Sequence, residues 1–158
     1  MNEKIMRRRD RQLGPDECRA ILERGEYGVL ATTDAEGQPY AVPLSFLFVK
    51  GYLYFHCACE GHKIDNLAAN PKVSFAVVGR TDTVYKGSYT VYYESVVAFG
   101  KVMPVTDDNE REAALRALTH KYYPANLDGL DEYLHKRLKS TAVYALDPEV
   151  ITGKSNRK

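Results

Sequence analysis

Short apolar runs, separated by glycine, proline and charged residues, recur along most of the chain. They are rich in Val, Tyr, Phe and Leu, which is typical of β-strands. The residues between them include Lys50-Gly51, a pair that suits a two-residue hairpin turn. The pattern predicts six strands, at residues 28–33, 39–49, 52–59, 73–78, 92–105 and 142–151.

Helical patterns occupy the segments between some of these strands. Pro15, Asp16 and Glu17 follow Gly14 as a typical helix start, and Gly25 ends that helix. In the longest helical segment, alanine and leucine side chains fall on one face, which predicts a buried side. That segment is 109–122, and further helices are predicted at residues 63–69 and 130–138.

The order of these elements indicates the fold class. Strands come first and helices later, without regular alternation, which argues against a doubly wound parallel sheet. The first three strands follow one another through short turns, so we expect a meander of consecutive antiparallel strands. Residues 80–90 are polar and predict a loop, and Gly100 predicts a bend in the long strand. The prediction is a mainly β (α+β) fold, a small six-stranded barrel with flanking helices.

Length and composition favour one domain over residues 1–158. The net charge of +1 gives no reason to expect a nucleic-acid or membrane partner. No apolar run approaches the roughly 20 residues of a membrane span, and the N-terminus lacks a signal-peptide core, so we expect a cytoplasmic protein. The 3 cysteines, an odd number, fit reduced thiols. Residues 1–11 form a basic arm, which is either solvated or reaches over a phosphate or a partner subunit.

The stretch 51–71 carries the strongest chemical signal. A strand leads into a turn at Gly61, and a short helix then starts with His62, Lys63 and, one turn on, Asn66. A helix start offers free backbone N–H groups and the positive end of the helix dipole, and Lys63 adds a charge beside them. The pattern predicts a phosphate-binding turn, with a solvated helix lysine as the alternative interpretation of Lys63.

The same stretch raises the question of a metal site, because His56, Cys57, Cys59 and His62 lie close together in sequence. Structural zinc usually takes two separated pairs of ligands, and no second pair exists here, so no metal is expected. In a strand, Cys57 and Cys59 share one face, where we expect them in the core, and His56 points to the other face. His56 is then either a hydrogen-bonded structural residue or a contact for a ligand held at the turn.

Taken in order, several segments of the chain resemble a known family: residues 6–11, 27–31, 37–45, 53–63, 70–73, 93–96 and 151–154. The resemblance is to the FMN-binding split-barrel superfamily related to pyridoxamine 5′-phosphate oxidase, and within it to the nitroimidazole-resistance (Nim-type) proteins. It implies a six-stranded antiparallel split β-barrel with Greek-key connections. It also implies a homodimer with two flavin sites at the subunit interface.

The resemblance further assigns three groups of residues to the flavin mononucleotide (FMN). The flavin ring would lie along Val42, Pro43, Leu44 and Ser45. The phosphate would be held by His56, Cys57, Ala58, Gly61, His62 and Lys63, with help from Asn66. The partner subunit would bring to the ring its Tyr93, Glu94, Ser95 and Val96.

The activity implied is that of an FMN-dependent oxidoreductase that reduces a small-molecule acceptor, such as a nitroimidazole or another nitroaromatic compound. His56 is the candidate catalytic residue and His62 the alternative, because histidine can donate a proton near neutral pH. The strands over residues 29–78 carry few Arg and Lys side chains, so a vitamin B6 oxidase is not expected.

Two other interpretations of the chain stay open. One is a non-catalytic carrier or sensor of flavin, haem or deazaflavin, with His56 and His62 as candidate haem ligands. The other is a dimeric barrel that has lost its site.

Overall fold

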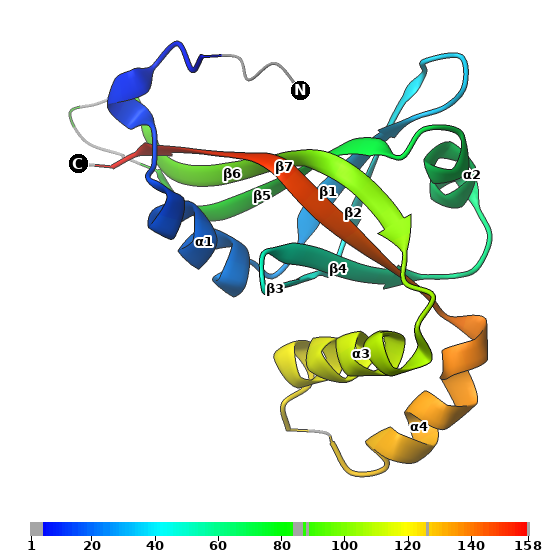
Figure 1. Ribbon diagram of the computed structural model, residues 1–158. Helices are drawn as coiled ribbons and strands as arrows, with labels where there is room; N and C mark the ends of the chain where they lie inside the picture. The colour runs from blue at the N-terminus through cyan, green and yellow to red at the C-terminus, as the bar shows by residue number, and fades with distance from the viewer. Residues whose placement is uncertain (1–4, 84–86, 88, 126, 158) are drawn as a thin grey trace.

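The computed structural model describes residues 5–83, 87, 89–125 and 127–157. Figure 1 shows one strongly twisted sheet, with α1 at the left of the view, α2 at the right, and α3 and α4 together beneath β4. The elements are η1 (Arg9–Arg11), α1 (Pro15–Arg24), β1 (Gly28–Thr33), β2 (Pro39–Leu44), β3 (Leu47–Val49), β4 (Tyr52–Cys57), α2 (His62–Ala69), β5 (Lys72–Thr83), β6 (Val91–Pro104), α3 (Asp108–Tyr122), α4 (Leu130–Arg137), η2 (Leu138–Ser140) and β7 (Ala142–Asn156).

The strands form a single antiparallel sheet in the order β2-β1-β5-β6-β7-β4-β3. The mainly β, α+β class is therefore confirmed, whereas the prediction of six strands is wrong, because the sheet has seven. Its order has two ends, β2 and β3, so the described strands form an open sheet rather than a closed barrel.

The additional strand boundary lies at Ser45 and Phe46, which divide the predicted strand 39–49 into β2 and β3. β2 pairs with β1 at one edge of the sheet, and β3 pairs with β4 at the other. The predicted meander is thus wrong, since the chain crosses between the two edges at Ser45-Phe46. The apolar run continues through this crossover because the Phe46 side chain is fully buried in the core, so no polar break marks it.

The hairpin between β3 and β4 agrees with the predicted turn. Lys50 has a φ of 51° and Gly51 a φ of 88°, the left-handed geometry that a two-residue hairpin turn requires. The following strand is shorter than predicted, however, because β4 ends at Cys57. Cys59 lies past the strand end and is exposed. The expectation that it shares the core face with Cys57 is wrong, because strand alternation does not extend beyond Cys57.

Strands β5 and β7 extend further than the apolar pattern predicts, whereas β6 is displaced by one residue from the predicted 92–105. β5 continues to Thr83, although residues 80–90 predict a loop, and its polar end pairs with β6; residues 84–86 and 88 of that loop lie outside the described residues. The bend expected near Gly100 is confirmed by a register shift between Phe99 and Gly100. A Cβ on Gly100 would lie 2.0 Å from the Asp147 carbonyl oxygen, so this close approach of two backbones requires glycine.

Two clusters of buried side chains hold the sheet and helices together. On the inner face of the sheet, Phe46, Phe55 and Phe75 are buried together with Ile21 and Leu22 of α1. The apolar stripe of α1 therefore packs against this face. The second cluster joins α3 and α4 to the outer face of the sheet near β4 and β7; its buried members are Val105, Ala114, Leu115, Leu130, Leu134 and Val143.

All four α-helices confirm the predicted ones to within a residue at each end. The first turn of α3 is capped by Asp107, whose carboxylate accepts a hydrogen bond from the backbone N–H of Glu110 at 2.8 Å.

Over the part of the chain that the structure describes, no helix combines the length and apolar character that a bilayer crossing needs.

Candidate flavin and acceptor site

The first turn of α2 has the geometry expected of a phosphate-binding turn. Gly61 precedes the helix with a φ of 124°, a conformation that side chains rarely adopt. Its carbonyl accepts the N–H groups of Ile64 at 2.7 Å and of Asp65 at 3.2 Å. The helix itself therefore provides no acceptor for the N–H groups of His62 and Lys63, which remain available to an anion at the helix start.

Aromatic stacking ties this turn to the edge strand β2. The rings of His62 and Tyr40 lie with their centroids 4.1 Å apart. Tyr40 belongs to β2, the strand that carries Val42 and Leu44. The structure thus brings the predicted phosphate turn beside the predicted ring-binding strand, and this proximity depends on a contact between residues 22 positions apart in sequence.

The residues predicted along the flavin ring face alternate sides of β2. Val42 and Leu44 are partly buried and pack against the core, whereas Pro43 and Ser45 are exposed. Pro43 and Ser45 therefore have the side chains available to a ligand at this edge. Val42 and Leu44 could contribute their backbone.

Asn66 has a structural role that the sequence did not indicate. Its side chain is 2% exposed, and its amide donates a hydrogen bond to the Thr32 hydroxyl at 2.9 Å. Thr32 is also buried, on β1. The amide thus satisfies a buried polar group between α2 and β1 rather than pointing to the start of the helix.

His56 and Cys57 occupy opposite faces at the end of β4, as strand alternation predicts. Cys57 lies on the face of Leu53 and Phe55 and is half-buried. Burial raises the pKa of the Cys57 thiol, and the nearby charge of Lys63 partly opposes that shift. Ala58 follows the strand and is exposed beside the turn. The inward cysteine and Lys63 are therefore neighbours.

His56 points from the outer face of β4 into a cavity of about 580 Å³. Ser45 also lines this cavity, and α3 and α4 supply most of the other lining residues. The lining includes Leu115, Leu118, Tyr122, Tyr123, Tyr133 and Arg137. The protein around His56 desolvates the imidazole and lowers its pKa, which favours the neutral form. The volume is within the 300–1,000 Å³ that is usual for small-molecule sites.

Residues 93–96 show the same alternation on β6. Tyr93 and Ser95 are half-buried on the outer face of the sheet, whereas Glu94 and Val96 are buried on the inner face. Side chains of Glu94 and Val96 therefore cannot reach a ligand that lies against the outer face. Of the four residues predicted to approach a partner's flavin, only Tyr93 and Ser95 have side chains on the side facing outward.

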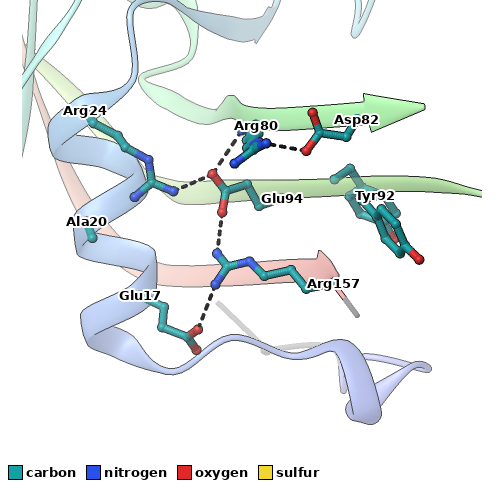
Figure 2. A pocket seen from close by; sticks show the side chains of 9 residues that line it. Glu17, Ala20, Arg24, Arg80, Asp82, Tyr92, Glu94 and Arg157 are labelled. Atoms are coloured by element: carbon teal, nitrogen blue, oxygen red, sulfur yellow. Dashed lines mark hydrogen bonds and ion pairs between the residues drawn. The ribbon is translucent and has the colours of Figure 1, made fainter. Parts of the chain in front are cut away.

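Glu94 is instead the centre of an ion-pair cluster, seen in Figure 2. One carboxylate oxygen accepts hydrogen bonds from the Arg24 guanidinium and, at 2.9 Å, from the Arg80 backbone N–H; the other accepts from Arg157. Burial tends to raise the pKa of Glu94, but these hydrogen bonds outweigh it and lower the pKa to about 2. The cluster joins α1, β5, β6 and the end of β7 through one buried carboxylate.

The cluster borders a second cavity, of about 640 Å³. Arg24, Arg80 and Arg157 line it together with the carboxylates of Glu17, Asp82 and Glu94. Arg157 lies 3.5 Å from Glu17, and Arg80 lies 2.7 Å from Asp82. Because the cations and anions balance and pair with one another, this cavity has no net charge with which to attract an anion.

The sequence profile of the pyridoxamine 5′-phosphate oxidase family matches residues 14–155. The chain belongs to this family. The match covers both the turn at Gly61 and the cavity lined by α3 and α4, and it confirms the family resemblance. A comparison with curated proteins found no match.

Solved structures extend this comparison. A protein of Bacteroides thetaiotaomicron described as a candidate 5-nitroimidazole antibiotic resistance protein is 27% identical, with a TM-score of 0.81 over 91% of this chain and 86% of that one. An FAD-binding protein of Mesorhizobium loti is 25% identical, with a TM-score of 0.69 over 93% and 98% of the two chains. An FAD- and haem-binding protein of Mycobacterium smegmatis, 21% identical with a TM-score of 0.79 over 94% and 74%, shares the fold.

Sequence reasoning about this family member missed the arginines that surround Glu94, and it missed Tyr122 in the wall of the His56 cavity. Arg24, Arg80 and Arg157 are far apart in sequence and each looks like an ordinary surface charge. Gly79, beside Arg80, has no room for a Cβ, which would lie 2.6 Å from the Glu94 carboxylate, but this close approach is visible only in the structure. Among the described residues, no group of three or more His, Cys, Asp or Glu side chains could hold a metal ion.

Proposed function

We propose that this protein binds FMN and uses it to reduce small organic acceptors, with nitroaromatic compounds as the expected class. The observation that carries the proposal is the family match over residues 14–155, together with the phosphate turn at Gly61 inside it. The likeness to the Bacteroides protein, at 27% identity over most of both chains, supports the nitroaromatic class.

The residues at the site fit a flavin phosphate. The N–H groups of His62 and Lys63 and the ammonium of Lys63 offer hydrogen bonds and positive charge at one point, and Gly61 supplies the backbone conformation that exposes them. The edge of β2 beside this turn offers Pro43 and Ser45 to the ring. When bound, flavin would supply the transfer of a hydride or an electron pair.

The cavity that contains His56 is the proposed site of the acceptor. Leucine and tyrosine side chains of α3 and α4 would exclude water and pack against an aromatic ring. The imidazole of His56 would form a hydrogen bond to the polar group of the acceptor and, as the imidazolium, would deliver a proton to it and become neutral. Ser45, at the end of β2, would lie between the two compartments.

A homodimer is part of the proposal, and the outer face of the sheet supports it. Pro43, Val29, Ala76 and Val97 form one row across β2, β1, β5 and β6. These side chains are small or apolar and only partly covered within one chain. The helices pack elsewhere, α1 and α2 on the inner core and α3 and α4 near β4 and β7. A second copy on this face would place its Tyr93 and Ser95 beside the flavin.

A non-catalytic carrier or sensor is the second candidate function, because the Mycobacterium protein of the same fold binds FAD and haem. His56 and His62 would be the haem ligands in that case, and FAD or deazaflavin would be the other cargo. The reduction of an acceptor separates this function from the first.

The test starts with the absorption spectrum of the purified protein, before and after addition of FMN. The bound flavin is then reduced chemically without oxygen and mixed with a 5-nitroimidazole. Rapid reoxidation of the flavin, with consumption of the nitro compound, is the expected result. A stable reduced flavin would support the carrier, a haem band would redirect the proposal to haem, and a colourless protein that takes up no FMN would overturn both.

A further inference from the structure

The crossover between β2 and β3 presents an unusual hydrogen-bonding problem. Phe46 lies outside both strands, yet its side chain is fully buried and packs edge-to-face on Phe75 with ring centroids 5.2 Å apart. A buried backbone N–H or C=O without a partner costs about 1–3 kcal/mol. The sheet supplies neither partner at Phe46, so both must come from another part of the chain.

The last turn of α3 supplies both. The Phe46 N–H donates to the Tyr122 hydroxyl oxygen at 3.0 Å, and the Lys121 ammonium donates to the Phe46 carbonyl at 3.0 Å. The Tyr122 hydroxyl has one proton and two carbonyls in reach, Glu26 at 2.6 Å and Phe46 at 2.9 Å. Because the Lys121 ammonium already donates to the Phe46 carbonyl, the Tyr122 hydroxyl donates its proton to the Glu26 carbonyl. Every donor and acceptor in the network then has a partner.

The surroundings of these two side chains agree with an internal role. The Lys121 ammonium also lies 4.3 Å from the centre of the Phe46 ring. Burial lowers the pKa of Lys121 and raises the pKa of Tyr122. The end of α3 is thereby attached to the crossover and to the loop before β1, segments 76 and 96 residues away in sequence from Tyr122.

The crossover also borders the proposed site. Ser45, the residue before Phe46, lines the same cavity as His56 and Tyr122. Ser45 has no strand partner that could fix its position, since β2 ends at Leu44. The Ser45 side chain also hydrogen-bonds to Tyr122, so its position relative to His56 is set by Tyr122 directly and through the hydrogen bonds at Phe46.

We infer that Tyr122 and Lys121 are positioning residues for the flavin edge. They hold the Ser45-Phe46 crossover where β2 and the His56 cavity meet, without contacting the flavin themselves. This inference rests on the proposed function, because it takes the flavin to lie along β2 up to Ser45. It adds a specific consequence: flavin affinity depends on a hydroxyl and an ammonium at the end of α3.

The central test compares Tyr122→Phe with the wild type. Removal of the hydroxyl takes away the acceptor of the Phe46 N–H, so we expect faster hydrogen exchange at the Phe46 amide in the flavin-free protein. We expect FMN to bind roughly tenfold more weakly, the scale of one lost buried hydrogen bond. Exchange of the β6 and β7 amides should stay unchanged, which separates a local displacement from general destabilisation.

Two further variants sharpen the test. Lys121→Met keeps the aliphatic contact with Phe46 but loses the donor, and should weaken FMN binding, whereas Lys121→Arg retains a donor and should recover most of the affinity. Tyr27→Phe is the matched control, because Tyr27 is 56% exposed and lies outside both cavities. It should leave FMN affinity and the Phe46 amide unchanged.

The outcomes separate the inference from the proposed function. Unchanged Phe46 exchange in Tyr122→Phe would overturn the hydrogen-bond assignment. Faster exchange with unchanged FMN affinity would overturn the positioning role alone and leave the proposed function standing. A wild-type protein that binds no FMN would overturn the proposed function, and with it any role of α3 in flavin binding.

Discussion

At the scale of single residues, Lys63 shows how a side chain adds to what the backbone offers. It follows Gly61 and His62 at the start of α2, where N–H groups and the helix dipole already favour an anion. Lys63→Met should weaken FMN binding about tenfold, because a charge-assisted hydrogen bond to phosphate is lost. Lys72→Met, an exposed lysine at the start of β5, is the control. Equal affinities of the two variants in a fluorescence titration would contradict the phosphate assignment.

His56 carries the proposed proton transfer, and its environment predicts a pH dependence. Partial desolvation of the imidazole in its cavity lowers its pKa below the ordinary 6.5, which favours the neutral form. If the imidazolium is the donor, turnover should rise as the pH falls through that lowered pKa and decline above it. His56→Ala should abolish turnover with FMN still bound, while His120→Ala, outside both cavities, should not. Full turnover in His56→Ala would remove the catalytic role.

Glu94 illustrates a residue whose charge is structural. Its pKa is about 2 in the folded protein against an ordinary 4.5, so the ionised carboxylate stabilises the fold above pH 4.5. That contribution is lost as the pH falls from 4.5 toward 2. Glu94→Gln should reduce the free energy of unfolding at pH 7 by roughly 2 kcal/mol, because buried hydrogen bonds lose their charge.

Urea unfolding at pH 7 and pH 3 measures this difference. The gap between wild type and Glu94→Gln should narrow at pH 3, because the unfolded wild-type chain binds a proton at Glu94 below about pH 4.5, whereas the folded protein, with a pKa of about 2, does not. Asp82→Asn breaks an exposed pair with Arg80 and should cost less than about 1 kcal/mol. A gap of constant size at both pH values would show that the charge of Glu94 is not what stabilises the cluster.

At the scale of elements, the contact between β6 and β7 depends on one position. The register shift at Gly100 brings its backbone against Asp147, with no space for a Cβ. Gly100→Ala should reduce the free energy of unfolding by roughly 3 kcal/mol, because two backbones must separate. Gly14→Ala, whose added Cβ would meet only a Glu17 side-chain oxygen at 3.8 Å, should change stability far less. Similar unfolding midpoints in urea would mean that the strands can slide to accommodate the methyl group.

At the scale of the whole molecule, the uncovered outer face of the sheet predicts the assembly. Val97 lies in the row with Ala76, Val29 and Pro43, so a charge at this point would be buried against a second copy. Val97→Glu should give a monomer in light scattering and should lose FMN. Met103→Glu, on the same strand but 57% exposed at its far end, is the control. A Val97→Glu protein that remains dimeric would place the interface on another surface.

The sequence by itself determined the α+β class, the four helices, the Lys50-Gly51 hairpin and the bend at Gly100, and it indicated the family. These features depend on local rules, namely strand alternation, helix periodicity and the conformational freedom of glycine. The conformation of the turn at Gly61 belongs with them, because Gly61, His62 and Lys63 are contiguous, and its binding of phosphate stays a prediction. Local patterns sufficed wherever the residues that act together are neighbours in the chain.

Only the tertiary structure decided what depends on distant contacts. The apolar run through Phe46 does not reveal that the chain changes sheet edges there, because burial in the core looks the same in a strand and in a crossover. Asn66 and Glu94 carry polar side chains that suit a ligand, yet Thr32 and three arginine residues elsewhere in the chain satisfy them inside the protein. A polar side chain is available to a ligand only if no other part of the fold has already satisfied it, and that depends on three-dimensional proximity.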